Sequence, residues 1–128
     1  MEKKIIRSEQ APAPVGPYSQ AVELNGWVFC SGQIALDPQS GQIVAPGDVR
    51  GQTHQVMRNI QSVLNAAGLD LSHIVKTTIF LTDMNDFTTV NEVYAKFFTQ
   101  APPARSTVAV LGLPKGVQVE IEVLAARS

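Results

Sequence analysis

The sequence has little of what metal-binding and disulfide-stabilised proteins need. It contains one cysteine, Cys30, and two isolated histidines, His54 and His73. A single cysteine cannot form an internal disulfide, and neither histidine has a partner at the spacing that metal ligands require. The glycine-containing segments lack the Walker and dinucleotide-binding motifs. We therefore expect no metal site and no phosphate-binding loop, and we expect histidines that are solvated or hydrogen-bonded.

Charge and long apolar runs are also scarce. Charged residues make up 16% of the 128-residue chain, and the formal net charge is −1. Such a chain offers no positive field for a phosphate backbone, so nucleic-acid binding is not expected. No apolar stretch is long enough for a signal peptide or a membrane span, which makes a cytoplasmic protein the expectation. The low charge content further suggests that partner subunits cover part of the surface.

The pattern of apolar residues predicts a single domain over the whole chain, with six strands and two helices. Asn25 and Gly26 join two strand-like runs and are the strongest hairpin signal in the sequence. Asp48 is suited to cap the first helix, and Gly68 to end it. The strands are expected at 3–7, 19–24, 27–33, 73–83, 105–111 and 117–125, the helices at 48–67 and 87–98, and the domain at 1–128.

The order of these elements, β-β-β-α-β-α-β-β, favours an α+β sandwich with one mixed six-stranded sheet and both helices on one face. In the segment 73–83, one side of the strand is strongly apolar. Its members are Val75, Thr77, Ile79 and Leu81. Since the chain has no further element for the second face of the sheet, we expect oligomerisation to cover it.

Three charged residues lie within strand-like segments near the C-terminus, where an unpaired charge costs free energy. Arg105 follows a proline turn and opens a strand, so its guanidinium either pairs with an internal glutamate or binds a carboxylate ligand. Glu120 and Glu122 share one face of their strand, while apolar residues fill the other. The face of the strand that carries the two glutamates must therefore be exposed to solvent, lie at an interface, or line a cleft.

Whether Arg105 and Glu120 share a face depends on how the last two strands pair. If Gly112 pairs with Val117, the two charges share a face; if Leu111 pairs with Val117, they point to opposite faces. A shared cleft requires the first arrangement, a bulge, or contributions from two subunits. The sequence leaves this register open.

Four other residues are candidates that also have a structural explanation. Cys30 lies in an apolar run without a neighbouring base, so a core position is favoured over a nucleophile. Ser31 lacks a G-x-S-x-G context and is better explained as a hydrogen-bonding group at a strand end. The ring of Tyr18 either shapes a pocket or, as favoured, packs at a strand start. Asn91 either caps a backbone group or faces a polar cavity.

Several segments together resemble the successive motifs of the RidA/YjgF family of reactive-intermediate imine deaminases. They cover almost the whole chain and include GPYSQA, SGQI, AAGL, NDF, PARS and VEIE. The resemblance implies a chorismate-mutase-like fold, a homotrimer with three clefts between subunits, and no metal or cofactor. It also implies hydrolysis of small 2-imino acids, such as 2-iminobutanoate and 2-iminopropanoate, or their enamine tautomers, to 2-oxo acids and ammonia.

The same resemblance implies roles for individual residues. Arg105 matches the arginine of PARS and would hold the substrate carboxylate, while Glu120 matches the first glutamate of EIE and would orient or activate water. Thr107 stands where several bacterial members have cysteine, so its role is expected to come from its backbone or small side chain. Glu122 is expected to be a structural group at an interface or on the surface. The residues that match pocket positions are Tyr18, Ser31, Gly32, Asn91, Arg105 and Thr107.

Two other classes of function stay open. A binding module would use the same cleft for a small carboxylate, or act on partner proteins in a chaperone-like manner, without releasing ammonia. RNA cleavage, attributed to some relatives, fits poorly with a net charge of −1 and no basic stripe.

Overall fold

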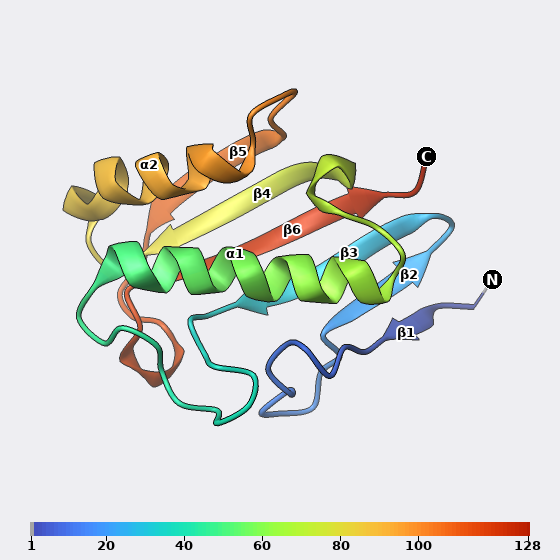
Figure 1. Ribbon diagram of the computed structural model, residues 1–128, viewed down its shortest axis with the longest axis horizontal. Coiled ribbons are helices and arrows are strands. Elements are labelled where there is room, and N and C mark those ends of the chain that lie inside the picture. Colours follow the sequence, from blue (N-terminus) through green and yellow to red (C-terminus); the bar gives the residue numbers. More distant parts are fainter. Residues whose placement is uncertain (1) are drawn as a thin grey trace.

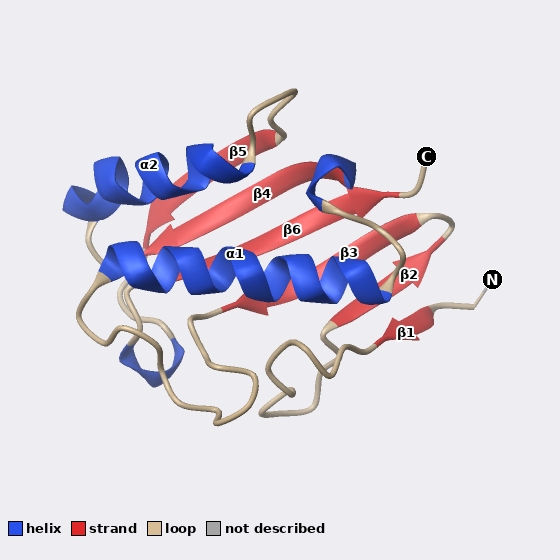
Figure 2. Cartoon of the chain, in the orientation of Figure 1, coloured by secondary structure: helices blue, strands red, loops and turns tan. Residues whose placement is uncertain are grey.

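A mixed sheet carries two long helices on one face in the computed structural model, which describes residues 2–128 (Figure 1; Figure 2). The predicted order of elements and the α+β class are confirmed. The strands are β1 (Lys4–Ile6), β2 (Ala21–Leu24), β3 (Trp27–Gln33), β4 (Ile74–Leu81), β5 (Ala104–Ala109) and β6 (Val119–Ala126). The helices are α1 (Val49–Ala66) and α2 (Phe87–Phe97), with 3-10 turns at Leu71–His73, Met84–Asp86 and Pro114–Gly116.

The strands follow the order β1-β2-β3-β6-β4-β5, so β4 lies between β5 and β6. β4 and β5 are parallel, as expected for strands joined by a crossover helix, and every other neighbouring pair is antiparallel. The connection from β5 to β6 passes the end of β4, where Val110 donates to Leu81 and Thr82 donates to Gln118. Both pairings considered for the last two strands are therefore wrong, because each assumed that these strands are neighbours.

The core lies between the helices and the sheet. Alternation along β6 buries every second residue, while Glu120 and Glu122 point to the opposite face, as predicted. Helix α1 lies across the middle of the sheet and contributes the largest buried side chains (Figure 1). The fully buried core residues include Val56, Met57, Ile60, Leu64, Ile79, Leu81, Val119 and Ile121.

The start of β4 departs from the predicted alternation. Ile74 is buried, whereas Val75 is 41% exposed. A register shift between Ile74 and Lys76 in the β4–β6 ladder accounts for the change, because a bulge rotates the residue that it inserts out of the regular pattern. The prediction that Val75 belongs to the apolar face is wrong, and the three other members of that face are buried.

The face of the sheet away from the helices has no covering element within residues 2–128 (Figure 1). Trp27, Phe29 and Val108 are exposed on it. Their position follows from the pleat, since Trp27 and Phe29 alternate with buried Val28 and Cys30. Large apolar side chains gathered on one face are typical of an interface. Oligomerisation through this face stays a prediction.

Both helices are amphipathic and pack one side on the sheet. The carboxylate of Asp48 caps α1 by accepting from the backbone N–H of Arg50 at 3.2 Å, and Gly68 follows the helix with a φ of 76°. Neither helix is long and apolar enough to cross a membrane in the part of the chain that is described. The cytoplasmic location stays a prediction.

The long loop before β2 is held by one buried side chain, that of Gln20. Its Nε2 donates to the carbonyls of Ser8 at 3.1 Å and Pro12 at 2.8 Å, and its Oε1 accepts from the N–H of Ser8 at 2.6 Å. Loop backbone groups that are removed from water need such partners. Gln20 thereby fixes the segment that carries Tyr18.

Gln20→Ala should lower the free energy of unfolding by about 2–3 kcal/mol, because buried backbone groups of the loop lose their partners. Urea unfolding measures this change. Gln42→Ala is the matched control, since Gln42 is exposed and its side chain makes no hydrogen bond within residues 2–128. The control should stay within about 0.5 kcal/mol of the unchanged protein. Equal effects of the two substitutions would contradict the anchoring role of Gln20.

Candidate functional site

The first candidate cavity opens beside the uncovered face of the sheet and holds four predicted site residues. Tyr18 comes from the loop before β2, Ser31 and Gly32 come from β3, and Glu120 comes from β6. We call it the Glu120 cavity, and its volume is about 440 Å³. The remaining lining residues are Pro12, Ala13, Val15, Gln20, Gln33, Ile34, Leu36, Pro114 and Glu122.

The carboxylate of Glu120 lies against the backbone of Gly32. The β3–β6 ladder shifts register between Cys30 and Gln33, so the intervening residues leave the regular pleat. A Cβ atom on residue 32 would lie 2.1 Å from Oε2 of Glu120, far inside van der Waals contact. Glycine is therefore the residue that leaves room for this carboxylate.

Ser31 uses its polar groups to hold the loop that carries Tyr18. Its hydroxyl donates to the carbonyl of Ser19 at 2.6 Å, and its backbone N–H donates to the carbonyl of Gln20 at 2.9 Å. Because the hydroxyl is used in the bond to Ser19, the geometry agrees with the hydrogen-bonding interpretation of Ser31. Tyr18 lines the cavity and is exposed, which agrees with the pocket alternative for this residue.

Glu120 is partly buried and its side chain has no ion pair within residues 2–128. Burial raises the pKa of Glu120 above its ordinary value, and repulsion from the Glu122 carboxylate raises this pKa further. A carboxylate with a raised pKa binds a proton more strongly, which suits a group that accepts a proton from water. Glu122 is exposed where it lines the same cavity, which agrees with the surface position expected for it.

The second candidate cavity lies between α2 and the start of β5. We call it the Arg105 cavity, and its volume is about 460 Å³. Arg105 enters it from the edge strand β5, and Asn91 enters it from α2. The other lining residues are Tyr94, Ala95, Phe98, Pro102 and Pro103.

The guanidinium of Arg105 is held by neutral groups alone. Its Nη1 donates to Oδ1 of Asn91 at 2.5 Å, and its Cζ lies 5.5 Å from the ring centre of Phe87 and 5.1 Å from that of Tyr94. Both distances are in the range of cation–π contacts. No carboxylate lies within ion-pair distance of Arg105 in the described chain, so the internal Arg–Glu pair is excluded. The other N–H groups of its fork are available to a ligand.

Two residues of this arrangement, Phe87 and Tyr94, are not among the site residues that the sequence predicts. The signal was their spacing with Asn91, since positions 87, 91 and 94 fall on one side of a helix. Asn91 accepts from Arg105 and lines the cavity, which agrees with the polar-cavity alternative for this residue.

Thr107 shares the face of β5 that carries Arg105, two residues away, and lies beside Ile79 of β4. Its hydroxyl oxygen is buried and has no hydrogen-bond partner within residues 2–128. Thr107 does not line the Arg105 cavity, so a direct contact with a ligand stays a prediction.

Arg105 and Glu120 lie on opposite faces of the sheet. Arg105 is level with Thr77 of β4, which points toward the helices, whereas Glu120 is level with Phe80, which points away from them. Adjacent strands carry residues in register on the same face. One copy of the chain thus places the two predicted catalytic residues, and the two cavities, on either side of the sheet.

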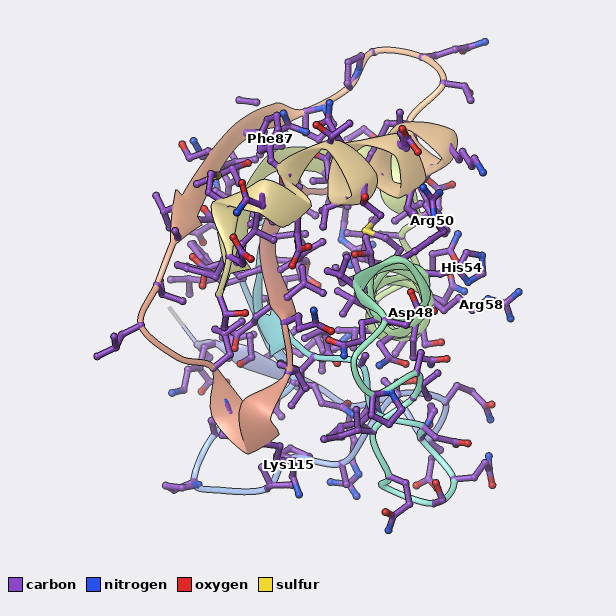
Figure 3. The ribbon with its side chains drawn as sticks, turned by 90° about the vertical axis from the view of Figure 1, so that its left-hand side faces the viewer. Asp48, Arg50, His54, Arg58, Phe87 and Lys115 are labelled. Atoms are coloured by element: carbon purple, nitrogen blue, oxygen red, sulfur yellow. The ribbon has the colours of Figure 1, made fainter. Side chains whose placement is uncertain are left out.

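The remaining nucleophile and ligand candidates are accounted for by packing. Cys30 is buried in the core, as favoured, and burial raises its pKa to about 12. His54 contacts the ring of Phe97 edge-on. It lies between Arg50 and Arg58 on the outer side of α1, away from Phe87 (Figure 3). No cluster of potential metal ligands is found among residues 2–128.

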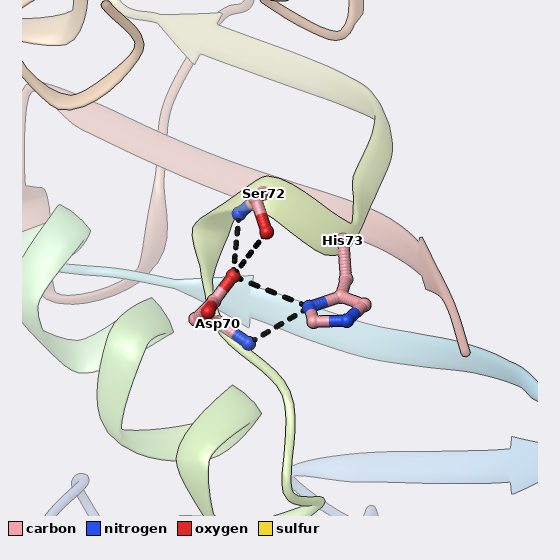
Figure 4. Close-up of polar contacts among 3 residues, drawn as sticks. All are labelled: Asp70, Ser72 and His73. Carbon is pink, nitrogen blue, oxygen red and sulfur yellow. Dashed lines mark hydrogen bonds and ion pairs between the residues drawn. The ribbon is translucent and has the colours of Figure 1, made fainter. Parts of the chain in front are cut away.

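Asp70, Ser72 and His73 have the composition of a hydrolase triad, but their geometry is that of a helix cap (Figure 4). The hydroxyl of Ser72 donates to Oδ1 of Asp70 at 2.5 Å, and Nδ1 of His73 accepts from the backbone N–H of Asp70 at 3.1 Å. A triad requires the serine hydroxyl to donate to the histidine instead. The prediction of a hydrogen-bonded histidine is confirmed for His73.

Sequence comparison finds close relatives over nearly the full chain. A family model described as Endoribonuclease L-PSP matches residues 8–127. A mouse protein named 2-iminobutanoate/2-iminopropanoate deaminase is 49% identical over 123 residues, which cover 96% of this chain and 90% of the mouse protein. A Synechocystis protein named RutC family protein slr0709 is 53% identical and covers 98% of this chain and 97% of its own length.

Structure comparison gives the same result. The structure of Escherichia coli TdcF with bound serine has a TM-score of 0.92 and 48% identity, covering 98% of this chain and 99% of that one. The structure of the E. coli YjgF gene product has a TM-score of 0.92 and 47% identity, covering 98% and 99%. RidA from an Antarctic Psychrobacter has a TM-score of 0.92 and 40% identity, covering 96% and 98%.

Glu122→Gln should lower the pKa of the Glu120 carboxyl, because the substitution removes one negative charge and leaves the burial of Glu120 in place. Carbon-13 NMR titration of the side-chain carboxyl measures this pKa directly. In the unchanged protein the pKa should lie above the ordinary value of a glutamate, and in the variant it should move toward that ordinary value. A Glu120 pKa that does not change on substitution would contradict the coupling, and Glu2→Gln serves as the exposed control.

Proposed function

This chain belongs to the Endoribonuclease L-PSP family, and we propose that it hydrolyses reactive 2-imino acids, or their enamine tautomers, to 2-oxo acids and ammonia. The observation that carries the proposal is the Arg105 guanidinium, which faces a cavity with no acidic partner within residues 2–128. Such a group is suited to a carboxylate ligand. The names of the mouse and bovine relatives, 2-iminobutanoate/2-iminopropanoate deaminase, support these two compounds as substrates.

In the proposed reaction, Arg105 binds the substrate carboxylate through two parallel N–H donors and thereby fixes the position of the imine carbon. Glu120 accepts a proton from water as the water oxygen bonds to that carbon. The resulting tetrahedral intermediate carries a hydroxyl and an amino group. Transfer of the proton from Glu120 to the nitrogen turns the amino group into a leaving group. As the C–N bond breaks, the hydroxyl gives its proton to the Glu120 carboxylate, so that ammonia and the 2-oxo acid are released. Turnover then falls as the pH is lowered through the raised pKa of Glu120.

The reaction needs Arg105 from one cavity and Glu120 from the other to contact the same substrate. We therefore place the site between two copies of the chain. A small imino acid cannot reach Arg105 and Glu120 on opposite faces of one sheet. A heterologous interface that closes into a ring joins the Arg105 cavity of one copy to the Glu120 cavity of the next. The uncovered apolar face supports such an interface, and the homotrimer implied by the family resemblance has three such sites.

The other predicted residues have roles around this substrate. Tyr18 and the backbone of Gly32 line the Glu120 side, where Ser31 fixes the loop. On the other side, Asn91 holds Arg105, and Thr107 borders it with a small side chain. No thiol chemistry is involved, since the chain's one cysteine, Cys30, is buried in the core.

A binding module that holds small carboxylates without turnover is the alternative, because the same cavities serve it. The two functions differ in one product, ammonia. A coupled assay in which a threonine dehydratase generates 2-iminobutanoate decides between them, by following 2-oxobutanoate and ammonia with and without this protein. RNA cleavage, which the name of the family describes, is tested with the same preparation on single-stranded RNA.

Arg105→Ala should reduce kcat/KM tens- to hundreds-fold, because a lost bidentate carboxylate contact removes about 2–4 kcal/mol of transition-state binding. The coupled assay measures this loss, and thermal unfolding checks that the variant is folded. Arg58→Ala is the matched control, since Arg58 is exposed on the outer side of α1 and has no ion pair in the described residues (Figure 3). A folded Arg105→Ala variant with normal turnover would rule out the proposed function.

A further inference from the structure

Helix α2 and strand β4 are joined by a buried pair of hydroxyl groups beside Arg105. The hydroxyl oxygens of Thr77 and Tyr94 lie 2.8 Å apart. Thr77 is fully buried and Tyr94 is 5% exposed. In that setting each hydroxyl depends on the other for its hydrogen bond.

This pair is linked to Arg105 by two separate routes. Thr77 is the residue directly beside Arg105 in the β4–β5 ladder. The ring of Tyr94 lies under the guanidinium, 5.1 Å from its Cζ. The contacts thus run from Arg105 to Thr77 through the strand pairing, from Thr77 to Tyr94 through the hydroxyls, and from the Tyr94 ring back to Arg105. Together they fix the position of the Tyr94 ring relative to β5, the strand that carries Arg105.

Arg105 needs such a support because β5 is an edge strand and an arginine side chain has several freely rotating bonds. Asn91 fixes one nitrogen of the guanidinium, while Phe87, also in contact, is more exposed than Tyr94. Tyr94 is thus the buried and hydrogen-bonded aromatic group in this arrangement. Burial also raises the pKa of Tyr94.

We infer that Tyr94 is a positioning residue for Arg105. Its hydroxyl, fixed by Thr77, holds the ring in place below the guanidinium, so that the N–H groups not used by Asn91 face the carboxylate of the ligand. The inference rests on the proposed function, because it takes the carboxylate to be that of the substrate or product. It adds a determinant of carboxylate affinity outside the set of predicted site residues.

The test is the binding of 2-oxobutanoate, the 2-oxo acid product, by isothermal titration calorimetry to the full chain in its native oligomeric state. Tyr94→Phe keeps the ring and removes the hydroxyl, whereas Tyr94→Leu removes both. The dissociation constant should rise about 3- to 10-fold in Tyr94→Phe, because the ring is kept but is no longer fixed by its hydroxyl. It should rise about 10- to 30-fold in Tyr94→Leu, because the cation–π contact is lost. In the coupled assay, KM should rise more than kcat falls.

A structural role in the core alone makes different predictions. Tyr94→Phe leaves the hydroxyl of Thr77 buried without a partner, so this variant should unfold at a lower temperature. The double variant Thr77→Val/Tyr94→Phe removes both hydroxyls and should recover much of that stability, while its affinity for 2-oxobutanoate stays weak. Recovery of affinity together with stability would overturn the inference.

A second comparison shows whether Tyr94 acts through its contact with the guanidinium. In an Arg105→Lys background, the effect of Tyr94→Phe on the dissociation constant should largely disappear, because a compact ammonium does not stack on the ring as a guanidinium does. An effect of unchanged size in that background would overturn the inference.

The outcomes also separate this inference from the proposed function. Weaker binding of 2-oxobutanoate by the Tyr94 variants, in a protein that releases no ammonia, supports the positioning role and removes the proposed function. Normal ammonia release with unchanged binding by the folded Tyr94 variants supports the proposed function and removes the positioning role.

Discussion

The position of β4 between β5 and β6 is the constraint on which the site depends. Because residues in register across neighbouring strands share a face, the central strand fixes Arg105 on the helix side of the sheet and Glu120 on the other. The guanidinium of Arg105 and the carboxylate of Glu120, whose pKa is raised, are thus separated by the sheet itself. One copy of the chain therefore cannot bring both groups to one small substrate, and the proposed function requires a second copy.

Burial and charge are distributed in agreement with that view. The helices cover one face of the sheet. On the other face, the strands carry apolar side chains that are exposed. Each charged group of the site is supported from within its own copy. Gly32 makes room for Glu120, while Asn91, Phe87 and Tyr94 hold Arg105 without neutralising it. A charge left unpaired by its own chain is costly unless a ligand or a partner completes it.

Local patterns in the sequence predicted the local structure well. The Asn25-Gly26 turn, the cap at Asp48 and the apolar periodicity of both helices rest on short-range rules, and the structure confirms them. The pairing of the last strands was wrong because strand neighbours are long-range contacts, and a crossover helix places β5 beside β4 instead of β6. The bulge at Val75 could not be predicted, because the alternation of apolar residues in the sequence is regular there.

The candidate site was predictable in part. Family motifs pointed to Arg105, Glu120 and the residues around them, and the structure gathers these into two cavities. The support of Arg105 by Phe87 and Tyr94 was hidden, because aromatic residues at helical spacing are first explained by core packing. Which groups of two copies meet depends on an interface that no pattern in a single chain encodes.

Mixing two impaired variants tests the shared site most directly. Arg105→Ala and Glu120→Gln, co-expressed at equal levels, should form mixed rings in which random assembly leaves about a quarter of the sites with both residues intact. The account predicts that the mixture recovers about a quarter of the unchanged protein's deaminase activity, well above the residual activity of either variant alone. A mixture that stays as inactive as its parents, although mixed oligomers are isolated with two affinity tags, would contradict it.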